Sequence, residues 1–146
     1  MPQTIEEALF GAEFYTDDEP YLLVKLPPAA ITLAASVIAE ISDPFCVLIV
    51  DKDEVTLVLP HEAPEEFESR LRDAALSEAR YRLITIDVEL EPDLIGFMAL
   101  VSRALADAGV GVFPYAAYTR DHILIPEPQI DAALTALKAL KEQYTA

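Results

Sequence analysis

The predicted secondary-structure elements occur twice in the same order, and this repetition limits the folds open to the chain. In the first half, an apolar strand is expected over residues 21–26 and a helix over residues 29–41. Two strands joined by a polar turn follow, over residues 45–50 and 55–59. Pro64 then opens a second helix, which has Phe67, Leu71 and Ala74 on one face. The first half therefore has the order β-α-β-β-α.

The second half repeats that order. Residues 82–88 alternate as a half-buried strand does, and strands are also predicted over residues 110–115 and 122–125. The helix between them is marked by apolar residues at helical spacing, which are Leu94, Met98, Val101, Leu105 and Ala108. Gly109 follows where a helix end favours a left-handed residue, and Pro128 opens the last helix. We predict a boundary near Ala79, with an N-terminal helix and the first repeat over residues 1–79 and the second repeat over residues 80–146.

The N-terminal helix has a start signal of its own. Thr4 and Glu7 have the spacing of a capping box, in which each side chain accepts a hydrogen bond from an otherwise free amide. Ile5, Leu9 and Phe10 give this helix an apolar edge for docking.

Charge excludes several classes of function. The chain has 26 acidic and 10 basic residues, a net charge of −16, and cannot neutralise phosphates, so no nucleic acid is expected as a partner. No apolar stretch is long enough to span a membrane, and the acidic N-terminus is unlike a signal peptide, so a cytoplasmic protein is expected. Residues 1–79 carry a net charge of −13 and residues 80–146 only −3, so a homodimer would form through the second half.

Catalytic and metal chemistry find little support in the residue pattern. Cys46 lies in an apolar run that is typical of a buried hydrophobic residue. Asp121 and His122 are adjacent on a predicted strand, so their side chains point to opposite faces and cannot easily act on one atom. His61 lies far from His122 in the sequence and forms no metal-ligand spacing with it. We therefore expect neither an enzyme, nor a metal site, nor a cofactor.

The duplicated order is that of ferredoxin-like α+β domains with antiparallel sheets. Four segments of the second half resemble the ACT domain: residues 84–88, Gly96-Phe97, residues 104–110 and residues 118–126. More narrowly, the chain resembles small bacterial proteins of two tandem ACT domains, which are related to the ACT repeats of the CASTOR arginine sensors. The resemblance covers residues 80–142 well, whereas residues 20–79 share only the order of elements. An ACT unit ends in a fourth strand and this chain ends in a predicted helix, so a strand must be shared or one sheet is short.

The resemblance implies a non-enzymatic regulatory protein whose ligand is a small molecule, typically an amino acid. The positions that match the family's ligand site are Asp93, Leu94, Ile95 and Gly96 before the helix, and Val110, Gly111, Val112 and Phe113 after it. Free amides at a helix N-terminus suit a ligand carboxylate, and Asp121 could pair with a ligand cation. The first-half loop holds Pro27 and Pro28, which lack amide donors, so only the second half can bind in this way.

Three alternatives stay open at this stage. Gly96 is explained equally by close helix-to-sheet packing and by close approach of a ligand. Tyr115 and Tyr118 either line a pocket or cap the sheet edge. The whole chain could also be a structural or protein-interaction module that keeps the ACT fold without a ligand, a function that Pro27 and Pro28 favour.

Overall fold

The computed structural model describes residues 2–41 and 45–145 and divides the chain into two compact units. Unit 1 holds Met1–Asp18 together with Tyr81–Ala146, and unit 2 holds Glu19–Arg80. The sequence pattern placed the N-terminal helix with the first repeat, whereas the structure groups it with the second. The reason is its apolar face, since Ala8 and Leu9 are buried in the core of unit 1.

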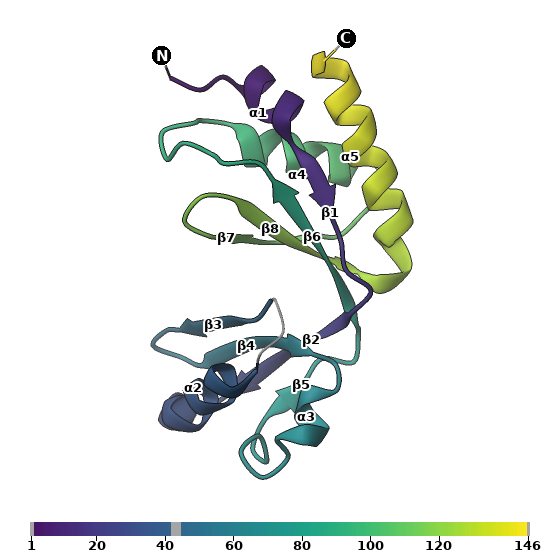
Figure 1. Ribbon diagram of the computed structural model, residues 1–146. Coiled ribbons are helices and arrows are strands. Elements are labelled where there is room, and N and C mark those ends of the chain that lie inside the picture. Colours follow the sequence, from purple (N-terminus) through teal and green to yellow (C-terminus); the bar gives the residue numbers. More distant parts are fainter. Residues whose placement is uncertain (1, 42–44, 146) are drawn as a thin grey trace. The chain divides into compact units, whose positions relative to one another are not determined.

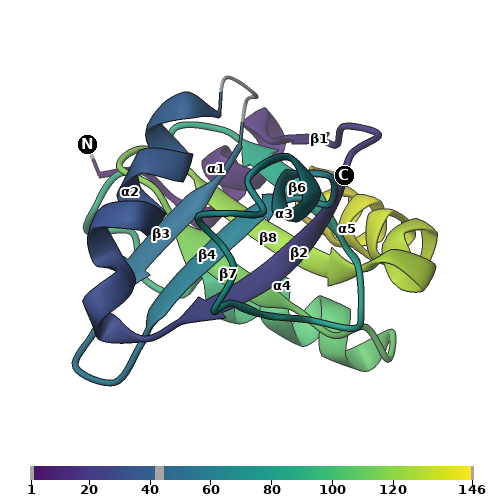
Figure 2. The same cartoon turned by 90° about the horizontal axis from the view of Figure 1, so that it is seen from below.

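Unit 2 is a four-stranded antiparallel sheet with helices against one face (Figure 2). Its elements are β2 (Pro20–Leu26), η1 (Pro28–Ala30), α2 (Ile31–Glu40), β3 (Val47–Val50), β4 (Val55–Pro60), α3 (Ala63–Glu66) and β5 (Ala75–Leu76). The strand order is β3-β4-β2-β5. Its core lies between α2 and the sheet, where Val37, Leu57 and Leu59 are fully buried.

The second helix of this unit is much shorter than the sequence predicted. The helix α3 ends at Glu66, and Phe67 leaves the helical conformation with φ −108° and ψ 33°. Single hydrogen-bonded turns then follow. The amide of Leu71 donates to the carbonyl of Phe67 at 3.1 Å, and the amide of Ala74 donates to the carbonyl of Leu71 at 3.0 Å. Phe67 and Leu71 are still buried, so their spacing reflects burial rather than a continuous helix.

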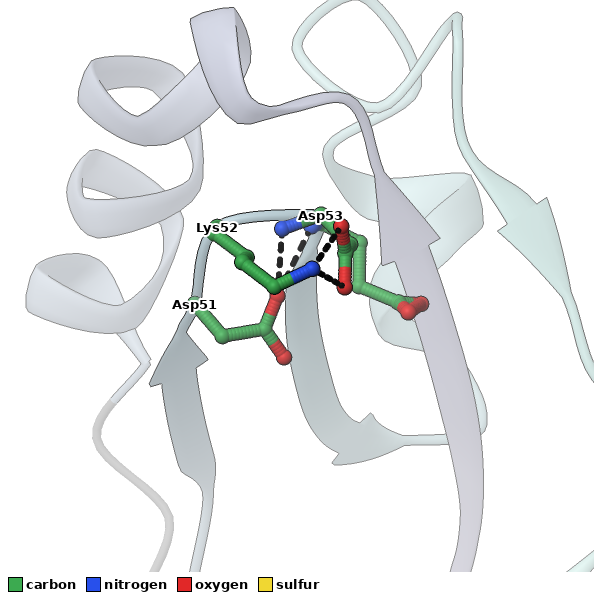
Figure 3. Close-up of polar contacts among 4 residues, drawn as sticks. Asp51, Lys52 and Asp53 are labelled. Atoms are coloured by element: carbon green, nitrogen blue, oxygen red, sulfur yellow. Dashed lines mark hydrogen bonds and ion pairs between the residues drawn. The ribbon is translucent and has the colours of Figure 1, made fainter.

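The turn between β3 and β4 is the polar turn that the sequence predicted (Figure 3). The Asp51 carboxylate accepts hydrogen bonds from the backbone amides of Asp53 at 2.8 Å and Glu54 at 2.9 Å. Because both bonds favour the ionised form, they hold the pKa of Asp51 below its usual value. The Lys52 ammonium lies 3.0 Å from the Asp53 carboxylate on the exposed side of the turn.

The described residues of unit 1 form three α-helices, a 3-10 helix and four antiparallel strands (Figure 1). Its elements are α1 (Ile5–Gly11), β1 (Glu13–Tyr15), β6 (Tyr81–Asp87), α4 (Phe97–Asp107), β7 (Phe113–Ala116), β8 (Asp121–Pro126), η2 (Glu127–Gln129) and α5 (Ile130–Thr145). The strand order is β7-β8-β6-β1. The expected capping box of α1 is present, since the Glu7 amide donates to Thr4 Oγ1 at 3.1 Å and the Thr4 amide to Glu7 Oε2 at 3.4 Å.

The fourth strand of unit 1 comes from the N-terminal segment. In unit 2, β5 pairs antiparallel with the first strand β2, and in unit 1, β1 pairs in the same way with β6, Tyr15 lying opposite Thr85. Both units thus have the strand order of a ferredoxin-like domain. The α+β fold with antiparallel sheets is confirmed, and neither sheet is short.

All three helices of unit 1 contribute to one core. Leu9 of α1, Val101 and Leu105 of α4, and Leu137 of α5 are almost fully buried, together with Ile84 of β6. The Lys141 ammonium of α5 also donates to the carbonyl of Ala12 at 2.7 Å, which ties α5 to the link between α1 and β1. This core fixes the direction of α4, whose N-terminus borders the candidate site.

Candidate functional site

A cleft of about 390 Å³ lies in unit 1 between the segment that joins β6 to α4 and the hairpin that joins β7 to β8. The first wall comprises Leu90, Glu91, Pro92, Leu94, Gly96, Phe97, Met98 and Ala99, and the second comprises Ala116, Ala117, Tyr118, Thr119, Arg120 and Asp121. The lining thus combines apolar side chains with the charged or hydroxyl groups of Glu91, Tyr118, Thr119, Arg120 and Asp121.

The two walls are joined by direct contacts. The amide of Leu90 donates to the carbonyl of Thr119 at 2.6 Å. The Arg120 guanidinium forms an ion pair with Asp87 at the end of β6. Within the hairpin, the amide of Ala117 bonds the carbonyl of Arg120 at 3.0 Å. These contacts hold the hairpin beside the β6–α4 segment.

Gly96 stands at the N-cap of α4, where its φ of 91° is left-handed. That conformation is readily adopted by glycine and disfavoured for other L-residues. A Cβ placed on Gly96 would lie 3.7 Å from Ile5 Cδ1, an ordinary contact, so close packing does not explain the glycine. No side chain caps α4, and Phe97, Met98 and Ala99 begin the helix along the cleft wall. The first amides of a helix have no partner within it and favour anionic groups.

Asp121 and His122 lie on opposite faces of β8, as the sequence indicated. Asp121 is the strand partner of Ile86, which is buried in the core under the helices. Asp121 therefore lies on the helix-covered face of the sheet, and it lines the cleft. Its partial burial raises the pKa of its carboxyl group, an effect that the neighbouring His122 partly offsets. His122 is level with Thr85, whose hydroxyl lies 2.8 Å from the ring Nδ1. Burial, and next the Arg120 charge, lower the pKa of His122, while the carboxylates of Asp121 and Asp87 oppose that shift.

The sequence-predicted residues divide into three groups. Leu94, Gly96 and Asp121 line the cleft, and Asp93 and Ile95 lie in the same segment outside its lining, the Ile95 side chain being 88% exposed. The third group, which is Val110, Gly111, Val112 and Phe113, lies apart from the cleft near the C-terminal end of α4. There the amide of Gly111 donates to Gln129 Oε1 at 2.9 Å.

The hairpin wall contains two residues that were not predicted, Thr119 and Arg120, and one of the two tyrosines whose role was left open. Arg120 and Thr119 line the cleft beside Asp121, and the sequence signal for them was their place in residues 118–126, one of the segments that resemble the ACT domain. Tyr118 lines the cleft at its rim with 97% of its side chain exposed. Tyr115 is half-buried and outside the lining, and burial raises the pKa of its hydroxyl.

Three further properties of the described residues concern metal binding, membrane crossing and thiol reactivity. Within residues 2–41 and 45–145, no three His, Cys, Asp or Glu side chains are grouped so that they could hold a metal ion. None of the helices in that part of the chain is both long and apolar enough to cross a membrane. Cys46 is partly buried in unit 2, and burial raises the pKa of its thiol, which disfavours the reactive thiolate.

Comparison with known proteins supports the fold. Residues 76–139 match the family model of the ACT domain. A Vibrio cholerae protein of unknown function, described as a possible transport protein, has a similar structure with a TM-score of 0.73 and 24% sequence identity, over 94% of this chain and 96% of that one. The regulatory subunit of aspartate kinase from Thermus thermophilus, in its ligand-free form, has a TM-score of 0.66 at 15% identity, over 88% of this chain and 97% of that one.

A putative C-terminal regulatory domain of aspartate kinase from Porphyromonas gingivalis has a TM-score of 0.63 at 14% identity, over 88% of this chain and 95% of that one. No match to this chain is found among curated proteins. The ferredoxin-like ACT fold is therefore established, and its similar structures include regulatory domains of aspartate kinases.

Proposed function

We propose that this chain is a non-enzymatic regulatory protein that binds an amino acid in the cleft of unit 1. The observation that carries the proposal is the cleft itself, in which the start of α4, the Asp121 carboxylate and apolar walls face one space. The ACT match over residues 76–139 includes both walls, and regulatory domains share the fold.

The chemistry of the cleft suits both ends of an amino acid. We propose that the ligand carboxylate meets the first amides of α4, next to Gly96, where the helix dipole favours negative charge. The ligand ammonium would pair with Asp121, and the ligand side chain would contact Leu90, Leu94 and Met98. Arg120 is already paired with Asp87, so it adds little net charge to the cleft.

Among the described residues of unit 2, the start of the first helix differs from that of α4. There η1 begins at Pro28 directly after Pro27, and neither residue has an amide proton to donate. We therefore propose that only unit 1 binds an amino acid through the amides at the start of a helix.

A thermal-shift screen against the twenty amino acids, tested separately, examines the proposal. An amino acid at 100 times its dissociation constant stabilises the native state by about 2.7 kcal/mol. Asp121→Asn keeps the shape of the side chain and removes its charge, so it should weaken binding by about 1.5–3 kcal/mol in calorimetry. Asp107→Asn, at the far end of α4, is the matched control and should leave the affinity unchanged.

The second candidate function is a protein-interaction module with the ACT fold and no ligand. The observation that favours it is the exposure of two large apolar residues beside the cleft. Ile95 in the β6–α4 segment is 88% exposed, and Tyr118 in the β7–β8 hairpin is 97% exposed. If no amino acid shifts the melting temperature, the amino-acid proposal fails and this second candidate takes its place.

A further inference from the structure

Gln3 is bonded to the segment that forms the first wall of the cleft. Its side-chain Nε2 donates to the carbonyl of Glu89 at 2.9 Å, and its Oε1 accepts from the amide of Glu91 at 2.9 Å. Its backbone amide also donates to Glu91 Oε2 at 3.0 Å. One residue near the N-terminus thus makes three hydrogen bonds to a segment that is far away in the sequence.

Gln3 is held in place by the helix that follows it. Thr4 is the N-cap of α1, and its capping box with Glu7 fixes the backbone directly after Gln3. The helix is fixed in turn by Ala8 and Leu9, which are buried in the core of unit 1. The bonds from Gln3 therefore connect the β6–α4 segment to a rigid part of the fold.

Leu90 and Leu94 pack against the core of unit 1, and the exposed backbone between them is held by few other hydrogen bonds. The amide of Leu90 bonds the Thr119 carbonyl across the cleft, and the amide of Leu94 bonds the Glu91 carbonyl within the segment at 3.1 Å. Segments with few tertiary bonds open more readily than the elements that flank them. A wall that is held in its binding position before the ligand arrives binds more tightly, since less ordering is required.

We propose that Gln3 is a positioning residue of the cleft, which holds residues 89–91 so that the segment before α4 is ready to bind. This inference rests on the proposed function of the cleft. Gln3 does not line the cleft, so it acts through Glu89 and Glu91 rather than by touching the amino acid. The N-terminal segment thereby becomes part of the binding apparatus.

The chain provides a matched control in Gln129. Its Oε1 accepts from the amide of Gly111 at 2.9 Å, and its Nε2 donates to the carbonyl of Gly109 at 3.3 Å. Gln129 thus bonds the segment after α4 with the same pair of side-chain atoms that Gln3 uses before α4. The two residues differ in which end of the helix they hold, and only Gln3 acts at the cleft.

The test compares Gln3→Met with Gln129→Met, because methionine keeps the length of the side chain and removes both polar atoms. Amide hydrogen exchange is followed by NMR at Leu90 and Glu91, and affinity is measured for each amino acid that shifts the melting temperature of the unmodified chain. We expect Gln3→Met to speed exchange at Glu91 and to weaken binding, each by about threefold to tenfold, as the loss of one or two hydrogen bonds implies. Gln129→Met should change neither quantity.

Each other outcome decides against the inference in a recognisable way. Unchanged exchange in Gln3→Met would show that Gln3 does not hold the segment. Faster exchange with unchanged affinity would show a structural role without positioning of the site, and equal loss of affinity in Gln129→Met would show a general effect on stability. If no amino acid shifts the unmodified chain, the proposed function itself fails and the positioning role falls with it, whatever the exchange rates show.

Discussion

Replacement of Gly96 by alanine should destabilise the fold through the backbone alone. Gly96 has a φ of 91°. An L-residue in this left-handed region has a conformational energy about 1–2 kcal/mol higher than glycine has there. Space does not add to this cost, since the new Cβ would lie 3.7 Å from Ile5 Cδ1, an ordinary distance. We therefore expect Gly96→Ala to lower the free energy of unfolding by about 1–2 kcal/mol, and Gly96→Asn to lower it by less, because asparagine tolerates this region better.

Gly111→Ala is the matched control for this prediction. Gly111 is outside the positive-φ region, and its new Cβ would lie 3.5 Å from Pro126 Cγ, again an ordinary contact. Alanine at such a position changes stability little, or raises it by about 0.4–1 kcal/mol through the unfolded state. Urea unfolding followed by circular dichroism measures all three variants. Equal stability of Gly96→Ala and Gly111→Ala would refute the assignment of Gly96 to a strained backbone position.

Two further predictions concern His122 and the core. Burial lowers the pKa of His122 in the folded protein below its ordinary 6.5, so the unfolded chain binds a proton at a higher pH than the folded chain does. The stability that the neutral ring contributes is therefore fully present above pH 6.5 and is lost as the pH falls through the lowered pKa. We expect the free energy of unfolding to fall as the pH is lowered from about 7 to about 5, and to fall less in His122→Gln, whereas equal slopes would contradict the shift. Leu137 is fully buried, so Leu137→Ala should cost about 2–5 kcal/mol in urea unfolding. Lys138→Ala, at the exposed residue next to Leu137, should change the free energy of unfolding by no more than about 0.5 kcal/mol. Similar losses in both variants would show that α5 does not bury the face that contains Leu137.

The elements that depend on neighbouring residues could be predicted from the sequence. The capping box of Thr4 and Glu7 is present as predicted, and so is the polar turn that begins at Asp51. Gly109 has the left-handed φ of 74° expected after a helix end. In each case the signal and the structure that it specifies lie within a few residues of one another.

Elements that depend on distant partners could not be predicted in this way. The strand β1 has three residues, too few for a periodic pattern, and it exists because β6 offers it an edge. The apolar spacing of Phe67 and Leu71 predicted a helix that does not form. Both residues are buried on one side of successive turns, and this burial produces the same spacing as a helix face.

The candidate site shows the same division. Leu94 and Gly96 were predicted because they match the ligand site that the resemblance to ACT domains implies, and Asp121 because an acid can pair with a ligand cation. Thr119 and Arg120 of the second wall were not selected, because the hairpin around Thr119 is brought to α4 by strand pairing and by the bond from Leu90. Gln3 carries no local signal for its role, since its partners Glu89 and Glu91 lie far along the chain.

The origin of β1 has a consequence for how the chain is made. Glu19–Arg80 is continuous in sequence and contains all four strands of its own sheet, so unit 2 can complete its pairing while the ribosome is still adding residues. The segment with α1 and β1 leaves the ribosome before unit 2 does, yet Leu9 has no core to enter until β6 and α4 have been synthesised. This segment thus completes its packing after unit 2 has been made, and a fragment that begins at Tyr81 would carry an uncovered edge on β6.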